Sequence, residues 1–427
     1  RGRMLRGPLI VGVLLCAAAC DVVGTSELSR RADAGVTDSG VHDSGVEIPP
    51  AEVCNFRDDD GDGRVDQGFD WVVDPWSVLQ STIYSPRWVQ AILLASGRVG
   101  VVVGEETGSS SAAELLVLPA SGPYENMVQR QELDIYHRGT AAAYSITESP
   151  AGEIGAALGA VDQALFVRVN SEGVQKDGPV TYGGLFMPHI TADLEWTPFG
   201  YVLATVDTLG IAHLSWLTDI GGIARDVVLI GNDNASMATQ ATPSGLAWVR
   251  ARSSLPLSVE YGLYSLDGTR ELLAPTLISD AQGANIKPYR SGRNILSLGD
   301  DLAILYDQLH RGIDTPKLVV TSTDGAIIKG PVGLTEPTDL DPLDMTIVDG
   351  NIVVLSLATH PEIFGPGAYS ATLHRVDRSL ELVPAPNGPS SFVGSPFMSL
   401  VSTGAEILVL MSNSDGTTLH FTRVHCP

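Results

Sequence analysis

The sequence is poor in positive charge: 26 Lys and Arg residues stand against 50 Asp and Glu residues among 427 positions. From position 20 onward the balance is 23 minus 50, or -27, because residues 1–19 carry three Arg and no acid. Binding to nucleic acid or to an anionic membrane surface requires Lys and Arg to neutralise phosphates. This balance argues against both partners, and we expect cations or basic partners instead.

Long apolar runs and helical periodicity are also missing. After the first twenty residues no segment is long and apolar enough to cross a bilayer, and from Trp71 onward no helical period persists over a dozen residues. The chain contains no Gly-x-Ser-x-Gly elbow, His-Glu-x-x-His pair, Gly-rich phosphate loop or Cys-x-x-Cys. These absences favour a binding protein over an enzyme, although an active site assembled from distant segments would leave no local motif.

The first nineteen residues have the pattern of an export signal. Three Arg residues precede an apolar run at positions 8–19, which is too short to span a membrane. The run ends in three Ala residues before Cys20, and small residues before a cysteine resemble the bacterial lipobox. The resemblance implies that residues 1–19 are a removed signal peptide and that Cys20 is diacylated. The alternative is an ordinary secretory signal that is cut nearby.

Both alternatives imply an exported protein. The lipobox implies a lipoprotein of the bacterial cell envelope that contacts a membrane through its anchor alone, and it leaves the choice between inner and outer membrane open. Residues 20–53 follow as a disordered acidic tether, in which Thr-Asp-Ser-Gly-Val is almost repeated as His-Asp-Ser-Gly-Val. Such a composition buries too little apolar area to offset the entropy of ordering.

Only four cysteines are present, and two of them lie at positions 16 and 20. Cys54 and Cys426 remain, one just before the repetitive region and one next to the last residue. In an oxidising compartment this pair predicts a disulfide that joins the two ends of the folded domain. The alternative is two buried free thiols.

A turn with glycine followed by an apolar β-run recurs seven times after residue 71. The glycines are separated by 45 to 55 residues, and they are Gly97, Gly152, Gly200, Gly245, Gly299, Gly350 and Gly404. Later turns such as Asp267-Gly268 and Asp324-Gly325 indicate hairpins within the units. A period near fifty built from four short strands predicts an all-β, seven-bladed β-propeller over residues 71–427. The alternatives are tandem β-sandwiches, or a ring of six or eight blades.

The seventh unit ends before its fourth strand, and a β-run at residues 70–74 belongs to no unit. We expect this N-terminal strand to complete the last sheet, which removes an open edge and brings Cys54 near Cys426. The repeats carry neither the Gly-His and Trp-Asp signature of WD40 blades nor the double glycine of kelch blades. The prediction therefore concerns the architecture, and an architecture alone does not give a function.

Residues 54–70 are Asp-rich and have the spacing of a calcium loop. Asp58, Asp60 and Asp62 fall at ligand positions 1, 3 and 5, Gly63 falls at the sharp turn, and the Arg64 carbonyl falls at position 7. Asp66 takes position 9, but the bidentate acid of position 12 is missing. This spacing predicts a structural Ca²⁺ site with a weak affinity of about 0.1–1 mM.

The same run resembles the Asp-rich metal-binding motif of secreted bacterial proteins, C-N-G-x-D-D-D-C-D-G-x-x-D-E. Eight positions match over about fourteen residues, and Gly61 replaces the second cysteine. The loss of that cysteine leaves Cys54 available for Cys426. The alternative interpretation of this run is a solvated acidic segment at the end of the tether.

Two weaker candidates lie inside the repeats. Strand alternation places His189, Thr191, Asp193 and Glu195 on one face of a strand, where they could line a central channel and bind a ligand or metal. The alternative, which we favour, is a solvated or internally paired face. A small basic cluster consists of Lys287, Tyr289 and Arg290. No residue of either group forms a known catalytic motif.

The sequence thus predicts a monomeric, lipid-anchored binding or scaffold protein of the envelope with an accessory Ca²⁺ loop. Its partner would be an envelope protein or a glycan. The alternative function is an extracellular hydrolase or lyase that acts on glycan or peptide at the mouth of the channel.

Overall fold

The computed structural model describes residues 52–427 as β-strands and turns, apart from several gaps. The gaps are 81–85, 107–110, 127–128, 138–140, 161–162, 171–173, 183–188, 208, 219–220, 230–233, 253–257, 280–283, 286–292, 311–312, 335–339, 360–368, 388–389, 396 and 413–417. The signal peptide, Cys20, nearly all of the tether and the cluster at 287–290 lie outside the described residues and stay predictions. In the described part of the chain no helix could cross a membrane.

Each predicted repeat folds into one antiparallel sheet, or blade. Blade 1 contains β3 (Pro86–Leu93), β4 (Val99–Glu106), β5 (Ser111–Leu118) and β6 (Gln129–His137). Blade 2 contains β7 (Ala141–Glu148), β8 (Ile154–Ala160), β9 (Gln163–Val169) and β10 (Gln175–Tyr182). Blade 3 contains β11 (His189–Thr197), β12 (Gly200–Asp207), β13 (Ala212–Leu217) and β14 (Ile223–Leu229).

The next three blades repeat this plan. Blade 4 contains β15 (Asn234–Thr242), β16 (Gly245–Arg252), β17 (Ser258–Tyr264) and β18 (Glu271–Ser279). Blade 5 contains β19 (Ala284–Asn285), β20 (Ile295–Leu298), β21 (Asp301–His310), β22 (Ile313–Ser322) and β23 (Ile327–Gly333). Blade 6 contains β24 (Leu340–Val348), β25 (Asn351–Thr359), β26 (Tyr369–Val376) and β27 (Ser390–Gly394).

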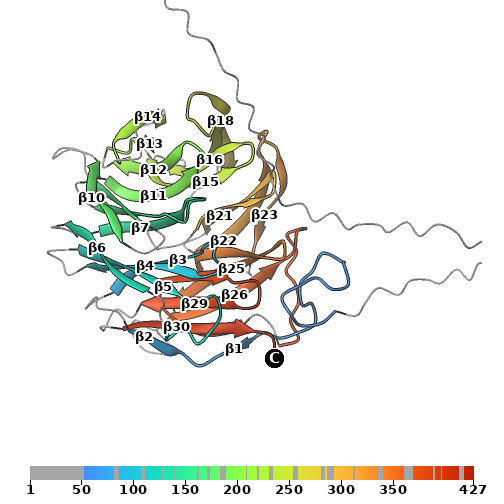
Figure 1. Ribbon diagram of the computed structural model, residues 1–427. Coiled ribbons are helices and arrows are strands. Elements are labelled where there is room, and N and C mark those ends of the chain that lie inside the picture. Colours follow the sequence, from blue (N-terminus) through green and yellow to red (C-terminus); the bar gives the residue numbers. More distant parts are fainter. Residues whose placement is uncertain are drawn as a thin grey trace, which may run out of the picture. The chain divides into compact units, whose positions relative to one another are not determined.

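Blade 7 is assembled from both ends of the chain, which confirms the predicted closure. Its C-terminal strands are β28 (Met398–Ser402), β29 (Ile407–Ser412) and β30 (Thr418–His425). The fourth position is filled by β1 (Val72–Val73) and β2 (Ser77–Gln80), which both pair antiparallel with β30. Figure 1 shows blue β1 and β2 beside red β30. Pro75, which has no backbone N–H, falls between the two short strands.

All seven repeat glycines lie between the innermost strand of a blade and the strand that follows it, and Gly200 and Gly245 are the first residues of β12 and β16. The φ angles of all seven are positive, between 75° and 156°, a conformation that side chains disfavour. At Gly245 a Cβ atom would approach the carbonyl oxygen of Tyr264 to 2.4 Å. The glycine period therefore identified the blades through the backbone geometry of one recurrent turn.

Seven hydrophobic clusters of described residues fill the spaces between neighbouring blades. In β4, Val101 and Val103 pack toward blade 7, whereas Val102 packs toward blade 2. Successive residues of a strand point to opposite faces, and both faces of a blade are covered. This double burial explains why the second strands are continuously apolar. The seven-bladed propeller is thus confirmed, and the tandem β-sandwich is wrong.

Candidate functional site

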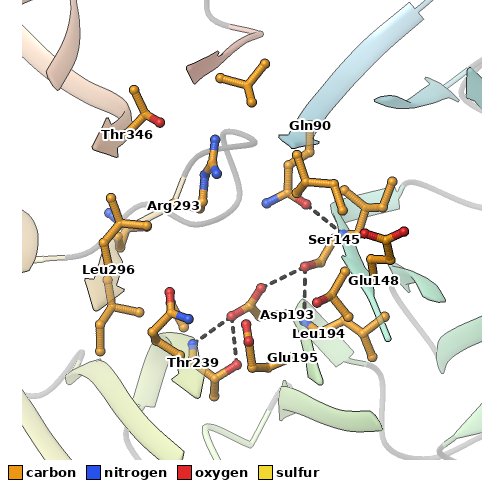
Figure 2. Close-up of a pocket in the computed structure, with 18 of the residues that line it drawn as sticks. Gln90, Ser145, Glu148, Asp193, Leu194, Glu195, Thr239, Arg293, Leu296 and Thr346 are labelled. Atoms are coloured by element: carbon orange, nitrogen blue, oxygen red, sulfur yellow. Dashed lines mark hydrogen bonds between the residues drawn. The ribbon is translucent and has the colours of Figure 1, made fainter. Parts of the chain in front are cut away.

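A cavity of about 580 Å³ lies where the innermost strands of all seven blades converge. Its walls come from β3, β7, β11, β15, β20, β24 and β28, together with the residues just before β20. Its charged side chains are Glu148, Asp193, Glu195 and Arg293. Figure 2 shows Asp193 and Glu195 side by side, with Arg293 across the cavity. This volume is typical of pockets for small molecules.

Hydrogen bonds between blades position the wall of this cavity. An innermost strand has a partner on one edge only, so N–H groups on its other edge need other acceptors. Gln90 Oε1 of blade 1 accepts the N–H of Ile146 in blade 2 at 2.8 Å. Ser145 Oγ of blade 2 accepts the N–H of Leu194 in blade 3 at 3.0 Å.

The same arrangement continues on the other side of the ring. Asp344 Oδ2 of blade 6 accepts the N–H of Leu400 in blade 7 at 2.9 Å. Ser399 Oγ of blade 7 then accepts the N–H of Ala91 in blade 1 at 3.1 Å. These contacts fix the first strands relative to one another, so the cavity is built into the closed ring.

Asp193 joins this belt of inter-blade hydrogen bonds and is fully partnered. Its carboxylate accepts the hydroxyl of Ser145 at 2.8 Å, the N–H of Thr239 at 2.6 Å and the hydroxyl of Thr239 at 2.9 Å. Burial raises the pKa of Asp193, and these hydrogen bonds oppose the rise. Asp193 therefore connects blades 2, 3 and 4 and also contributes a carboxylate to the cavity.

Glu195 lies two residues further along β11, on the same face as Asp193. Burial and then the negative charge of Asp193 raise the pKa of Glu195 to about 8. At neutral pH most Glu195 carboxyl groups therefore keep their proton, even though the residue is only partly buried. The positive charge of Arg293 acts on Glu195 in the opposite direction.

Arg293 is held by blades 6 and 7. Its Nε lies 3.4 Å from Asp344 Oδ1, its backbone N–H donates to the same oxygen at 2.8 Å, and its Nη2 donates to the Leu400 carbonyl. Asp344 is completely buried. The positive charge of Arg293 is therefore already balanced by a carboxylate that does not line the cavity.

Part of this site was predicted from the sequence. Strand alternation places Asp193 and Glu195 on a common face that could line the channel, and both line the cavity; the alternative of internal pairing also describes Asp193. The side chains of His189 and Thr191 lie outside the described residues. Glu148 and Arg293 were missed. Gln90, Ser145 and Asp193 each precede a turn glycine by seven residues, but Arg293 precedes Gly299 by six, so this spacing alone does not identify Arg293.

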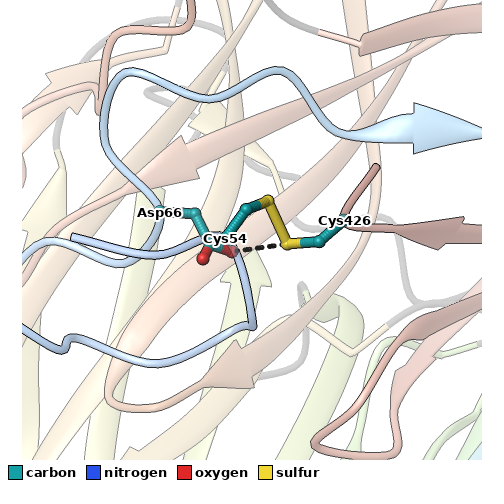
Figure 3. A group of neighbouring side chains, drawn as sticks. All are labelled: Cys54, Asp66 and Cys426. Atoms are coloured by element: carbon teal, nitrogen blue, oxygen red, sulfur yellow. Dashed lines mark hydrogen bonds between the residues drawn. A yellow bond between two sulfur atoms is a disulfide. The ribbon is translucent and has the colours of Figure 1, made fainter.

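The second candidate region is the neck, residues 52–71, next to the C-terminus. Cys54 and Cys426 form the predicted disulfide, with Cα atoms 5.4 Å apart (Figure 3). Asp66 Oδ2 lies 3.5 Å from Cys426 Sγ, which is a contact only, because a disulfide sulfur has no proton to donate. The two ends of the propeller are therefore joined covalently beside a buried carboxylate.

Asp66 is completely buried and holds the neck together. Its Oδ1 accepts the N–H of Asn55 at 2.7 Å, and its Oδ2 accepts the N–H of Phe56 at 3.1 Å and Trp71 Nε1 at 2.9 Å. The guanidinium of Arg375 lies 4.6 Å from the Trp71 ring centroid and donates to the Asp66 carbonyl. These contacts attach the neck to blade 6.

The Asp-rich loop brings a different set of acids together from the one that the spacing predicted. Carboxylate oxygens of Glu52, Asp58 and Asp60 lie within 4.8 Å of one another. Asp62 accepts a hydrogen bond from Gln67 Nε2 at 2.7 Å. Both oxygens of Asp66 are already used by the neck.

The side chain of Arg64 faces the propeller. It forms ion pairs with Asp377 at 3.1 Å and with Glu381 at 2.5 Å, both in the turn after β26. The Asp377 hydrogen bond raises the pKa of Arg64. The predicted role of Arg64 as a ligand concerns its carbonyl, which stays a prediction.

Comparison with solved structures agrees with the fold. A protein of unknown function from Dyadobacter fermentans aligns with a TM-score of 0.51 and 11% identity over 84% of this chain and 100% of its own. Virginiamycin B lyase from Staphylococcus aureus aligns with a TM-score of 0.49 and 12% identity, over 84% of this chain and 100% of its own. The Dos1 propeller aligns with a TM-score of 0.48 and 10% identity, over 82% of this chain and 95% of its own. Such identities show the fold alone. No protein-family model and no curated protein matches the sequence.

Proposed function

We propose that the chain is an exported, monomeric binding protein of the bacterial cell envelope whose ligand site is the central channel of the propeller. The observation that carries this proposal is the cavity of about 580 Å³, whose walls come from all seven blades and contain four charged side chains. Pockets of this size with a few convergent polar groups are the usual small-molecule sites of proteins. The ligand is a small molecule, or part of an envelope protein or glycan.

The lipobox-like sequence before Cys20 and the acidic tether support a membrane anchor at the N-terminus. Two acyl chains on Cys20 would give stable anchoring, whereas one chain gives only marginal binding. The tether would hold the propeller away from the membrane surface and leave its channel accessible to other envelope components.

We further propose that the neck binds Ca²⁺ in a structural role. Asp58, Asp60, Asp62 and the Arg64 carbonyl are the ligands expected from the loop spacing. Glu52 adds a carboxylate near Asp58 and Asp60, which supports the idea that it substitutes for the missing acid of position 12. Asp66 supports the loop from its buried side.

The experiment that tests the binding function is affinity capture from the cell envelope with residues 51–427, in Ca²⁺ or in chelator. A specific protein or glycan that is recovered above an unrelated propeller control supports the proposal. Sensitivity to chelator would assign a part of the binding to the neck. Empty capture under both conditions would contradict the binding function.

One observation favours the second candidate, an extracellular hydrolase or lyase. Asp193 and Glu195 are neighbouring carboxyl groups in different surroundings, and Glu195 holds a proton near neutral pH. Pairs of this kind supply the acid and the base in many hydrolytic sites. Turnover of envelope glycan or peptide that is lost in Glu195→Gln would favour this function over simple binding.

A further inference from the structure

We propose that the central channel binds an organic cation with one or more primary ammonium groups, for which Glu148, Asp193 and Glu195 provide the counter-charges. This inference rests on the proposed binding function and names the class of ligand. Three observations support it: the charge balance of the cavity, a buried hydrogen-bond acceptor without a donor, and the size of the cavity.

The charge balance of the cavity favours a cation. The lining residues contributed by β3, β15, β24 and β28 are uncharged. Arg293 is the only cation among the described lining residues, and the buried carboxylate of Asp344 already balances it. Three carboxyl groups therefore remain without a cationic partner in the described wall. A channel enclosed by protein concentrates their field, which attracts positive ligands.

Asn294 supplies an independent indication of a hydrogen-bond donor in the ligand. Its side chain is 3% exposed and lines the cavity. Its Nδ2 donates to the Leu305 carbonyl at 3.1 Å, whereas its Oδ1 has no partner in the described part of the chain. A buried acceptor without a donor costs free energy. The oxygen itself is buried, so an ammonium N–H in the cavity can satisfy it only after a small rotation of the Asn294 side chain; the same ammonium group would neutralise the carboxylates.

The spacing of the acids favours an extended organic cation over a metal ion. In the described part of the chain, the groups of three ligand atoms that lie within 4.8 Å of one another occur only at the neck. The channel carboxylates do not form such a group, and the cavity is far larger than one dehydrated ion. Ammonium groups on a short chain or on a sugar can reach separate carboxylates.

Binding has a proton balance that can be measured. Glu195 has a pKa raised to about 8 by burial and by Asp193. The charged groups that face it are Asp193 on its own strand, Glu148 on β7 and Arg293 before β20. A bound ammonium stabilises the carboxylate, so the Glu195 O–H bond breaks and the proton passes to the buffer. We therefore expect release of about 0.9 proton per bound ammonium compound at pH 7.

The same linkage makes the affinity depend on pH. If the ionised form of Glu195 is the competent one, the affinity increases about fivefold from pH 7 to 8 and decreases about tenfold from pH 7 to 6. Primary amines stay protonated over this range. The change therefore comes from the protein and not from the ligand.

The test is isothermal titration calorimetry of the full chain with putrescine and spermidine, in buffers with different ionisation enthalpies. We expect saturable binding, proton release at pH 7 and the pH dependence of the affinity given above. In Glu195→Gln, which keeps the size of the side chain, release and pH dependence should disappear and affinity at pH 8 should fall. Glu132→Gln, an exposed acid on β6, is the matched control and should behave like the unchanged protein.

Other results would overturn the inference. These are no binding of either amine, amine binding without proton release, or equal binding by the Glu195→Gln variant when circular dichroism shows both variants folded. If a neutral oligosaccharide binds more tightly than either amine, the ligand is not an organic cation, although the proposed binding function still holds. Binding of Ca²⁺ that is lost in Glu195→Gln would instead assign the channel to a metal. Envelope capture decides the proposed function separately.

Discussion

The neck and the channel are both acidic, but their carboxylates are organised in opposite ways. At the neck the acids lie within one short stretch of chain, and Asp66 is used entirely to hold that stretch together. In the channel the acids come from two blades, and Glu195, whose raised pKa keeps most of its carboxyl groups protonated at neutral pH, has no cationic partner in the described wall. The comparison shows that carboxylates of one protein can stabilise a segment through hydrogen bonds in one place and line an open cavity in another.

The largest expected effect is at the neck disulfide. Cys54→Ser with Cys426→Ser removes a cross-link across a separation of 372 residues. The chain-entropy model assigns such a link roughly 6 kcal/mol as an upper bound. Urea unfolding should show a loss of several kcal/mol. Reductant should lower the stability of the unchanged protein equally and leave the double variant unaffected; two free thiols in the oxidised protein would contradict this account.

Asp66→Ala should have the next largest effect, because it leaves buried N–H groups of the neck without an acceptor. We expect a loss of about 3 kcal/mol in the free energy of unfolding. Asp300→Asn, at an exposed position before β21, is the control and should change stability by less than about 0.5 kcal/mol. Equal effects of the two substitutions would show that the neck is not fastened through Asp66.

Glu195→Gln should change how stability depends on pH. In the folded protein the pKa of Glu195 is about 8, above its ordinary value of 4.5, so the folded state binds more protons between these values. Ionisation of Glu195 therefore lowers the free energy of unfolding as pH rises from about 4.5 to 8, and this loss of stability is complete above pH 8. The Gln variant should be more stable than the unchanged protein at pH 9, by about 2 kcal/mol after allowance for channel water.

Thermal unfolding of both proteins at pH 5, 7 and 9 measures this difference. The advantage of the variant should grow with pH and should be smallest at pH 5. A difference that does not vary with pH would show that Glu195 is ionised throughout this range, and the channel would then resemble the solvated acids of the neck.

Calcium should have the smallest effect. With a dissociation constant of about 0.1–1 mM, 2 mM Ca²⁺ should add about 1 kcal/mol to the free energy of unfolding. Asp58→Asn with Asp60→Asn should remove this increment, whereas Glu195→Gln should retain it. Stabilisation that survives the loss of Asp58 and Asp60 would place the ion elsewhere.

The sequence predicted the features that depend on local backbone geometry. The repeat glycines were detectable because one turn in each blade requires a positive φ. The closing strand and the disulfide were detectable because the last blade lacked a strand and two cysteines remained. Each of these inferences needs only the order of elements along the chain.

Other features depend on the closed ring and could not be predicted in this way. Glu148 shares a cavity with Arg293 and Asn294 although it is far from them in the sequence, because every blade contributes its first strand to one channel. The inward direction of the Asp66 side chain depends on the path of the neck over blade 6. The spacing of acids along the loop, from which the calcium ligands were predicted, contains no information about that path.

The most direct test of the central claim is envelope capture with the full chain, compared among the unchanged protein, Glu195→Gln and the Glu132→Gln control. If the channel is the ligand site, a specific envelope component should be recovered by the unchanged protein and the control, and its yield should fall at least severalfold with Glu195→Gln. Equal recovery by all three proteins, or recovery that is lost only when chelator is added, would contradict the account and assign binding to another surface.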